Sequence, residues 1–208
     1  MLMIKRTVIF LLFSLLSFTS LAKEKSPLQQ LESFLATTQS LSARFNQKLV
    51  DQYGDVLQQS AGTLSMQRPG KFRWDYTMPY PQNIISNGQK IWMYDSELEQ
   101  VNVRPYKQLK SSPVNLLDNE KLDEQFILES LIFTENQHWV RLTPKNPESD
   151  FKKMLVGLQN GKIKSMRFRD NFNQQTDIEF EELLINPGFK DSHFEFSAPE
   201  GSDIIGDF

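Results

Sequence analysis

The 208-residue sequence contains no cysteine, and this absence excludes several classes of protein. Without cysteine the chain can form no disulfide, has no thiol to receive a lipid after export, and provides neither a cysteine nucleophile nor thiolate ligands for a metal. The fold must therefore be held by packing, which the roughly 186 residues that follow the N-terminal segment can supply as one domain.

Histidine is almost as scarce, since His138 and His193 are the only two. No Gly-x-Ser-x-Gly motif occurs, so a serine hydrolase triad lacks both its nucleophile motif and a clear general base. Acidic pairs such as Asp123 and Glu124 have no histidine beside them, so we predict no metal site and read both histidines as surface residues.

Long apolar stretches are missing except at the N-terminus. There, two basic residues precede an apolar run from Val8 to Phe18, and the small-residue site Ser20-Leu21-Ala22 follows. About a dozen apolar residues are fewer than the roughly 20 that span a bilayer, so this pattern predicts a cleaved signal peptide, residues 1–22. The mature protein is expected to comprise residues 23–208 as a single exported domain.

Positive charge is outweighed by negative charge. Residues 1–22 hold two of the 23 basic residues and none of the 26 acidic ones, so the predicted mature chain has a formal charge of −5. An acidic chain without basic clusters argues against binding to nucleic acid.

The first structured element predicted is a helix. Ser26-Pro27-Leu28-Gln29 places a Ser cap, a Pro at the first helical position and a Gln three residues after the cap, as in a capping box. Leu28, Leu31 and Leu35 then recur at helical spacing, so one face of the helix is apolar and is expected to lie on a sheet. Ser112-Pro113 repeats the cap-plus-Pro signal and predicts a brief apolar helix with Val114, Leu116 and Leu117.

Most of the remaining chain alternates with the period of two that indicates strands. The alternation is clearest in 71–76, where three aromatic residues face one way and three charged residues the other. In 89–95 both faces carry apolar residues, with Trp92 and Tyr94 on one side and Ile91 and Met93 on the other. The predicted strands are 41–49, 56–66, 71–76, 82–86, 89–95, 100–104, 126–132, 138–143, 151–158, 162–169 and 175–184.

Short strands joined by tight turns predict one highly curved antiparallel sheet or barrel. Asn87-Gly88 and Asn160-Gly161 indicate hairpin turns, in which both central residues are expected to have positive φ. Such a barrel can either fill its interior with side chains or hold a ligand, and periodicity does not distinguish the two. A carbohydrate-active enzyme that uses Asp75 and Asp95 as its two carboxylates stays open on the sequence alone.

Several ordered motifs resemble a known family. The stretch from Arg68-Pro69-Gly70 to Trp74, the segment from Ser86-Asn87-Gly88 to Asp95, and the later motifs Leu142-Thr143-Pro144-Lys145 and Pro199-Glu200-Gly201-Ser202 are similar to those of the outer-membrane lipoprotein carrier family, LolA. The resemblance extends over essentially the whole chain from residue 23. It departs from the family pattern at Ser202, where an apolar residue is usual, and in the short C-terminus, so the geometry of the last strand stays open.

The resemblance implies a mainly β fold: a single unclosed half-barrel of about eleven antiparallel strands with a helical lid. It implies a monomeric periplasmic chaperone, not an enzyme and without a cofactor or metal. Such a chaperone accepts triacylated lipoproteins from the inner-membrane complex LolCDE and passes them to the outer-membrane receptor LolB. A lipid- or lipoprotein-sensing binding module of the same fold is the alternative.

The resemblance also implies roles for individual residues. Arg68 matches an arginine that holds the lid shut through main-chain carbonyls, although a solvated arginine at a strand end is the simpler reading of the residue itself. Candidates for the acyl-binding wall are Phe72, Trp74, Tyr76, Ile84, Trp92 and Met93, and candidates for the inner face of the lid are Leu31, Leu35, Leu116 and Leu117. Each of these could equally be an ordinary core residue.

Overall fold

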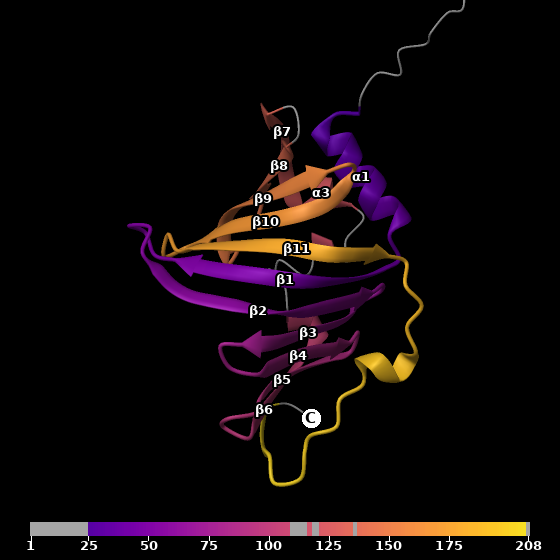
Figure 1. Ribbon diagram of the computed structural model, residues 1–208, viewed down its shortest axis with the longest axis vertical. Coiled ribbons are helices and arrows are strands. Elements are labelled where there is room, and N and C mark those ends of the chain that lie inside the picture. The colour runs from indigo at the N-terminus through magenta and orange to yellow at the C-terminus, as the bar shows by residue number, and fades with distance from the viewer. Residues whose placement is uncertain (1–24, 109–115, 118–120, 135–136, 207–208) are drawn as a thin grey trace, which may run out of the picture.

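A computed structural model describes residues 25–108, 116–117, 121–134 and 137–206. These residues form one 12-stranded sheet (Figure 1). In chain order the strands are β1 (Ser40–Val50), β2 (Val56–Gln67), β3 (Lys71–Met78), β4 (Gln82–Asn87), β5 (Lys90–Asp95), β6 (Gln100–Pro105), β7 (Phe126–Thr134), β8 (Gln137–Pro144), β9 (Phe151–Gln159), β10 (Lys162–Asp170), β11 (Gln175–Ile185) and β12 (Asp203–Gly206). The predicted signal peptide, Ser112-Pro113 and Val114 lie outside the described residues.

The sheet does not close on itself. Its order is β12-β6-β5-β4-β3-β2-β1-β11-β10-β9-β8-β7, so β12 and β7 are its two edges. Every neighbouring pair is antiparallel except β12, which runs parallel to β6. The predicted unclosed sheet and its eleven antiparallel strands are confirmed. The strand β12 lies in the C-terminal segment that alternation did not predict as a strand and whose geometry the family resemblance left open.

In the part of the chain that the structure describes, the helices are few and short. They are α1 (Pro27–Thr37), η1 (Tyr106–Gln108), α3 (Leu122–Gln125) and η2 (Asp191–Phe194), and Leu116 and Leu117 are also helical. The capping box predicted for α1 is present, because the Ser26 hydroxyl accepts from the Gln29 amide and the Gln29 side chain accepts from the Ser26 amide. None of the helices in the described ranges is long and apolar enough to cross a membrane.

The end of α1 is tied to the end of β11 by Asn186. Its side-chain oxygen accepts from the backbone N–H groups of Gln39 and Ser40, and its side-chain nitrogen donates to the carbonyl of Thr37. This contact fixes the connection between α1 and β1, so α1 lies across β7 to β10 (Figure 1).

The two predicted Asn-Gly hairpins differ in backbone conformation. Asn160 and Gly161 both have positive φ, at 51° and 71°, as expected for the two-residue turn. At the other hairpin only Gly88 has positive φ, so that expectation for Asn87 was wrong. The Asn87 side chain instead accepts from the amides of Gln89 and Lys90, and this contact stabilises the turn without left-handed geometry at Asn87.

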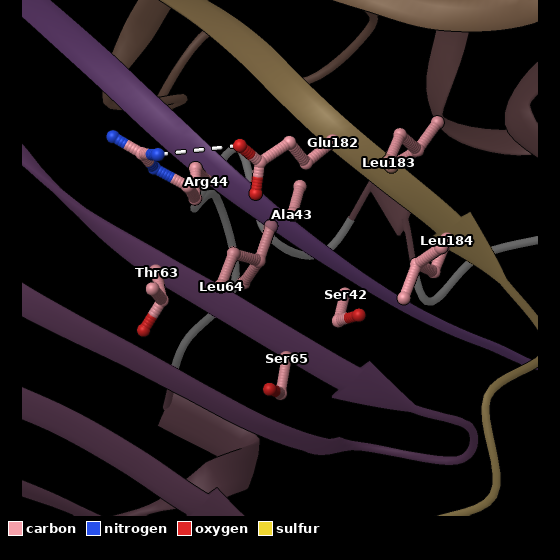
Figure 2. A pocket seen from close by; sticks show the side chains of 9 residues that line it. All are labelled: Ser42, Ala43, Arg44, Thr63, Leu64, Ser65, Glu182, Leu183 and Leu184. Carbon is pink, nitrogen blue, oxygen red and sulfur yellow. Dashed lines mark hydrogen bonds and ion pairs between the residues drawn. The ribbon is translucent and has the colours of Figure 1, made fainter.

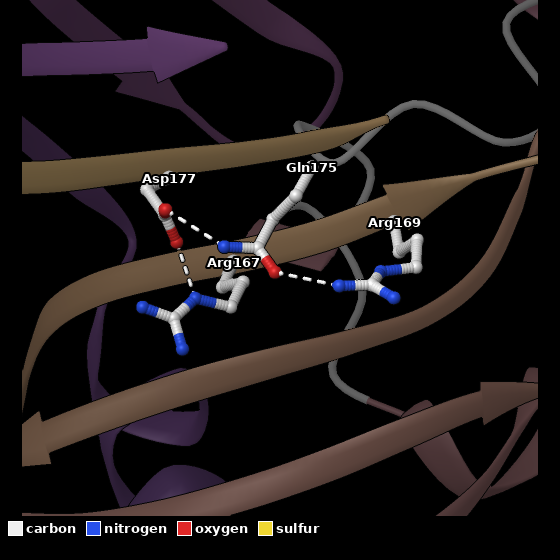
Figure 3. A network of polar contacts seen from close by, with 4 residues as sticks. All are labelled: Arg167, Arg169, Gln175 and Asp177. Atoms are coloured by element: carbon white, nitrogen blue, oxygen red, sulfur yellow. Dashed lines mark hydrogen bonds and ion pairs between the residues drawn. The ribbon is translucent and has the colours of Figure 1, made fainter. Parts of the chain in front are cut away.

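The two faces of the sheet carry different cores. The inner face, which α1 covers, holds the main apolar cluster, including Leu41, Phe45, Met66, Phe72 and Phe180. The outer face is largely polar, and Figure 3 shows part of it, where Arg167 donates to Asp177, Gln175 donates to Asp177, and Arg169 donates to Gln175. One-sided polarity is what an antiparallel sheet needs when a single face is buried.

A second, smaller core lies on the outer face of β4 to β6, beneath the C-terminal strap, which we define as residues 186–206. Phe194 of η2 is only 1% exposed, and η2 contacts β3 and β4. Farther along the strap, the Phe196 ring lies 6.2 Å from that of Trp92 and 5.7 Å from that of Tyr94. The buried side chains on this face are Ile85, Val101, Val103 and Phe194.

The strap ends in β12, which completes the sheet edge. Gly206 has a φ of 118°, and a Cβ at this position would lie 2.1 Å from the Val103 carbonyl oxygen. Glycine is therefore required for β12 to approach β6 this closely.

We expect the strap to make stability sensitive to mild acid through His193. The His193 ring is stacked on Phe189 and set edge-on to Phe194, and its Nε2 is buried with no hydrogen-bond partner among the described residues. Burial lowers the pKa of His193 below 6.5, and the Arg73 guanidinium lowers it further, against the opposite effect of Asp75. A histidine whose pKa is depressed by folding contributes stability that is complete above its unfolded pKa and is lost as pH falls through its folded pKa.

The measurement is the melting temperature of the wild-type protein and of His193→Gln between about pH 7.5 and about pH 5.5. The wild type should lose more stability on acidification than the variant, because His193→Gln removes this one proton-binding site. Identical pH profiles would contradict the assignment. Asp191, whose pKa the Lys71 ammonium lowers below 3.8, titrates outside this window.

Candidate functional site

The inner face of β2 to β5 forms an apolar wall of cross-strand neighbours. Trp74 lies opposite Ile84, and Ile84 lies opposite Met93, so the three side chains share this face. Phe45 from β1 adds a ring 4.9 Å from that of Trp74 and 5.1 Å from that of Tyr76. The structure therefore brings together five of the six predicted wall residues: Phe72, Trp74, Tyr76, Ile84 and Met93.

Trp92, the sixth residue predicted for the wall, is on the other face. Alternation along β5 puts Ile91 and Met93 on the inner face, whereas Trp92 points outward against Phe196 of the strap. The prediction for Trp92 was wrong, and Ile91, which is 4% exposed, takes the inner position.

The predicted lid residues pack against this wall. Leu31 and Leu35 of α1 and the helical pair Leu116 and Leu117 are each at most 2% exposed and belong to the same apolar cluster as the wall. The two helical segments are therefore joined to the sheet through one continuous apolar interface.

Arg68, at the turn between β2 and β3, connects the two parts of the lid. Its Nη1 donates to the Leu35 carbonyl at 2.6 Å, and its Nε and Nη2 both donate to the Leu117 carbonyl, at 2.9 and 2.7 Å. Leu35 is among the last residues of α1, where carbonyls have no partner within the helix. A guanidinium is suited to such an end because its donors diverge and its charge complements the helix dipole.

Burial of the wall decreases with distance from Arg68. In the row of cross-strand neighbours nearest Arg68 every side chain is buried: Met66, Phe72, Ser86 and Ile91. The next row is mixed, since Leu64 and Trp74 are buried while Ile84 and Met93 are half-buried. In the third row Tyr76, Gln82 and Asp95 are all half-buried. The apolar face is thus covered at the Arg68 end and partly accessible at the other end.

Two polar groups in the wall differ in how they are satisfied. The Tyr76 hydroxyl donates to the Gln47 side chain at 3.2 Å, and burial raises the pKa of Tyr76 to about 12, so the group stays neutral. The Trp74 Nε1 is buried and has no hydrogen-bond partner within the described residues. A buried N–H without a partner costs about 1–3 kcal/mol, so this donor is available to a ligand acceptor at the wall.

The pair Asp75 and Asp95 does not form a carboxylate site. Strand pairing places Asp75 on the same face as Tyr94, which is the outer face, and Asp95 on the same face as Tyr76, which is the inner face. Each is also engaged locally, since Asp75 accepts from Arg73 and Asp95 accepts from the amides of Glu97 and Leu98. Two carboxylates on opposite faces of a sheet cannot flank one glycosidic bond.

Two further hollows are formed by described residues. One of about 470 Å³ lies on the outer face beside a bulge in β11, where Glu182 has a φ of 52° (Figure 2). It is open to solvent and mixes polar and apolar side chains, including Arg44, which is paired with Glu182. Within the described residues, no group of three or more His, Asp or Glu side chains could hold a metal ion.

Comparison with known proteins decides the family. The sequence pattern of the family described as outer membrane lipoprotein carrier protein LolA matches residues 36–197. The chain belongs to the LolA family. Among its relatives, the outer-membrane lipoprotein carrier protein of Methylococcus capsulatus is 41% identical over 186 residues, which are 88% of this chain and 89% of that protein.

Further comparisons agree with this membership. The outer-membrane lipoprotein carrier protein of Methylobacillus flagellatus is 37% identical over 181 residues, 86% of this chain and 88% of that protein. Among solved structures, an uncharacterized conserved protein from Thermus thermophilus superposes with a TM-score of 0.52 at 11% identity, over 86% of this chain and 96% of that one. That likeness shows the fold alone, and the LolA assignment rests on the sequence matches.

Proposed function

We propose that this protein carries lipoproteins through the periplasm and covers their acyl chains with the apolar inner face of the sheet. The observation that carries the proposal is the position of Arg68, which links two lid segments over a continuous apolar wall. Membership of the LolA family supports the same function.

The physical need for such a cover is large. Each methylene group exposed to water costs about 0.8 kcal/mol, so three acyl chains cannot pass through water unshielded. The lid leucines are packed against the wall. Opening the lid would expose the apolar surface of both, and the acyl chains could then cover that surface.

Reversible binding requires that the empty state be stable as well. A lid that closes on the apolar wall competes with the cargo for the same surface. The apparent affinity for cargo is then the affinity of the open state multiplied by the fraction of carrier that is open. In this proposal the bonds from Arg68 to Leu35 and Leu117 stabilise the closed state and so allow the cargo to be released.

The wall also offers a polar contact for the cargo. The unpartnered Trp74 Nε1 can donate to an ester carbonyl at the glycerol end of the acyl chains. Because Trp74 adjoins the half-buried Ile84, this contact places the ester groups toward the accessible end of the wall.

The proposed pathway begins at the inner-membrane complex LolCDE and ends at the outer-membrane receptor LolB. The test is ATP-dependent release of a triacylated lipoprotein from inner-membrane vesicles that contain LolCDE, with vesicles lacking ATP and vesicles lacking carrier as controls. We expect the lipoprotein to appear in the soluble fraction as a one-to-one complex with residues 23–208, and then to move to LolB when LolB is added. A carrier that binds the lipoprotein but releases none from the vesicles would point instead to a sensing module of the same fold.

A further inference from the structure

One end of the sheet carries five turns, and we call four of them the turn edge: β1–β2, β3–β4, β5–β6 and β10–β11. The fifth, β8–β9, lies beside β10–β11, where the Asn171 side chain donates to the Ser149 carbonyl. Val50 pairs with both Val56 and Gln175, so the β1–β2 and β10–β11 turns adjoin. Tyr76 pairs with Gln82 beside the β3–β4 turn, and Asp95 pairs with Gln100 beside the β5–β6 turn. Because Gln82 also pairs with Asp95, these two turns lie at the same end of the sheet. In Figure 1 the four turns lie along the left side, away from α1 and η2.

Apolar side chains project from this edge into solvent. Of the eleven exposed large hydrophobic residues in the described part of the chain, seven lie here: Tyr53, Val56, Leu57, Met78, Tyr80, Leu98 and Phe172. Tyr53 and Phe172 are 82% exposed and Leu98 is 69% exposed, so each side chain stands at the tip of its turn. Scattered surface hydrophobics are ordinary, but this concentration on one edge indicates an interaction surface.

Three of these turns have a backbone that is fixed by the same device. An aspartate side chain accepts from two backbone N–H groups within its own turn, which restrains the turn as an Asx motif does. In each case one of the two donors belongs to the exposed residue: Asp51 bonds to Tyr53, Asp95 to Leu98 and Asp170 to Phe172. The backbone at the apolar tips is therefore restrained before any partner arrives, which reduces the backbone entropy lost on binding.

The charge of the turn edge is of one sign. Residues 51–57, 78–81, 95–99 and 170–174 contain six acidic residues and no basic one. The adjoining β8–β9 turn, residues 145–150, adds two acidic residues and Lys145, and Lys152 of β9 donates to Asn173, so the excess of negative charge extends to this border. An edge with this charge repels an anionic lipid surface and a second copy of itself, and it attracts a basic surface.

We propose that the turn edge docks onto a partner protein whose face is basic and carries apolar recesses that receive Tyr53, Leu98 and Phe172. This proposal rests on the proposed function, since the candidates for the partner are LolCDE and LolB. The edge lies at the accessible end of the apolar wall, so docking there would present the acyl-binding face to the partner.

The test compares the triple variant Tyr53→Ser, Leu98→Ser and Phe172→Ser with the wild type, using purified LolCDE in detergent, purified LolB and a fluorescent triacyl lipopeptide. The triple variant should bind at least one of the two partner proteins about tenfold more weakly or worse, with lipopeptide affinity unchanged. A second variant, Asp55→Asn with Glu97→Gln and Glu99→Gln, should weaken the same complex and reduce its dependence on salt.

A matched pair of single variants controls for the loss of a surface leucine. Leu98→Ser should weaken docking, whereas Leu184→Ser, at a site 62% exposed on the outer face of β11, should not. The proposal would be overturned if the triple variant bound both partner proteins with wild-type affinity. Binding to zwitterionic vesicles is measured in parallel, and a triple variant that lost vesicle binding but kept partner binding would also overturn the proposal. Loss of lipopeptide binding by the triple variant would also overturn it, whereas failure of the wild type to bind lipopeptide would count against the carrier function instead.

Discussion

Arg68→Leu should bind cargo more tightly than the wild type and release it more slowly. The substitution removes the donors to the Leu35 and Leu117 carbonyls and places an apolar side chain at the turn. Hydrogen bonds from a charged donor contribute about 1.5–3 kcal/mol, so the closed state should lose about 2 kcal/mol relative to the open state. Where the empty protein is mostly closed, this raises the apparent affinity by about 30-fold. The measurements are the dissociation constant for a triacyl lipopeptide and the half-time of its transfer to LolB.

Two further variants separate the proposed latch from a general effect of charge. Arg68→Lys keeps the charge but presents a single ammonium in place of a fork, so it should hold one carbonyl and give an intermediate result. Arg44→Leu removes an exposed arginine that pairs with Glu182 on the outer face and should behave as the wild type does. If Arg68→Leu binds and releases cargo at wild-type rates, Arg68 is not a latch.

The strands could be predicted because their alternation follows directly from which face is buried. Eleven strands and the first helix agree with the pattern of apolar residues and caps in the sequence. Alternation did not predict β12, because its four residues are all exposed and are held by pairing with β6 alone. The conformation of Asn87 was missed because its side chain substitutes for the geometry that an Asn-Gly pair usually adopts.

The candidate site was predictable only in part, and β5 shows why. Alternation already separated Trp92 from Met93, so the two could not both line the wall, but nothing local says which face is the inner one. That choice is made by the strap, whose Phe196 is far along the chain from β5 and covers the Trp92 side. The carbonyls that accept from Arg68 likewise belong to residues 33 and 49 positions away along the chain. Only the family resemblance predicted that Arg68 would contact carbonyls of the lid.

Met93→Asp should abolish acyl binding while leaving the protein folded. Met93 is half-buried in the second row of the wall, so a carboxylate there can reach water in the empty protein. Bound acyl chains would cover that carboxylate, and burying an unpaired charge costs several kcal/mol, so lipopeptide affinity should fall by at least about 100-fold. The melting temperature and the lipopeptide dissociation constant are measured on the same preparation, so that lost binding is separated from lost folding.

The matched control is Leu184→Asp, which introduces the same charge at an exposed site on the outer face and should leave the affinity unchanged. Ile84→Asp, the cross-strand neighbour of Met93, should reproduce the loss, because both side chains belong to one row of the wall. A Met93→Asp protein that melts cooperatively and still binds lipopeptide as the wild type does would place the acyl chains away from this row. The half-buried rows would then be ordinary core, and the accessible end of the wall could not be the entry point for cargo.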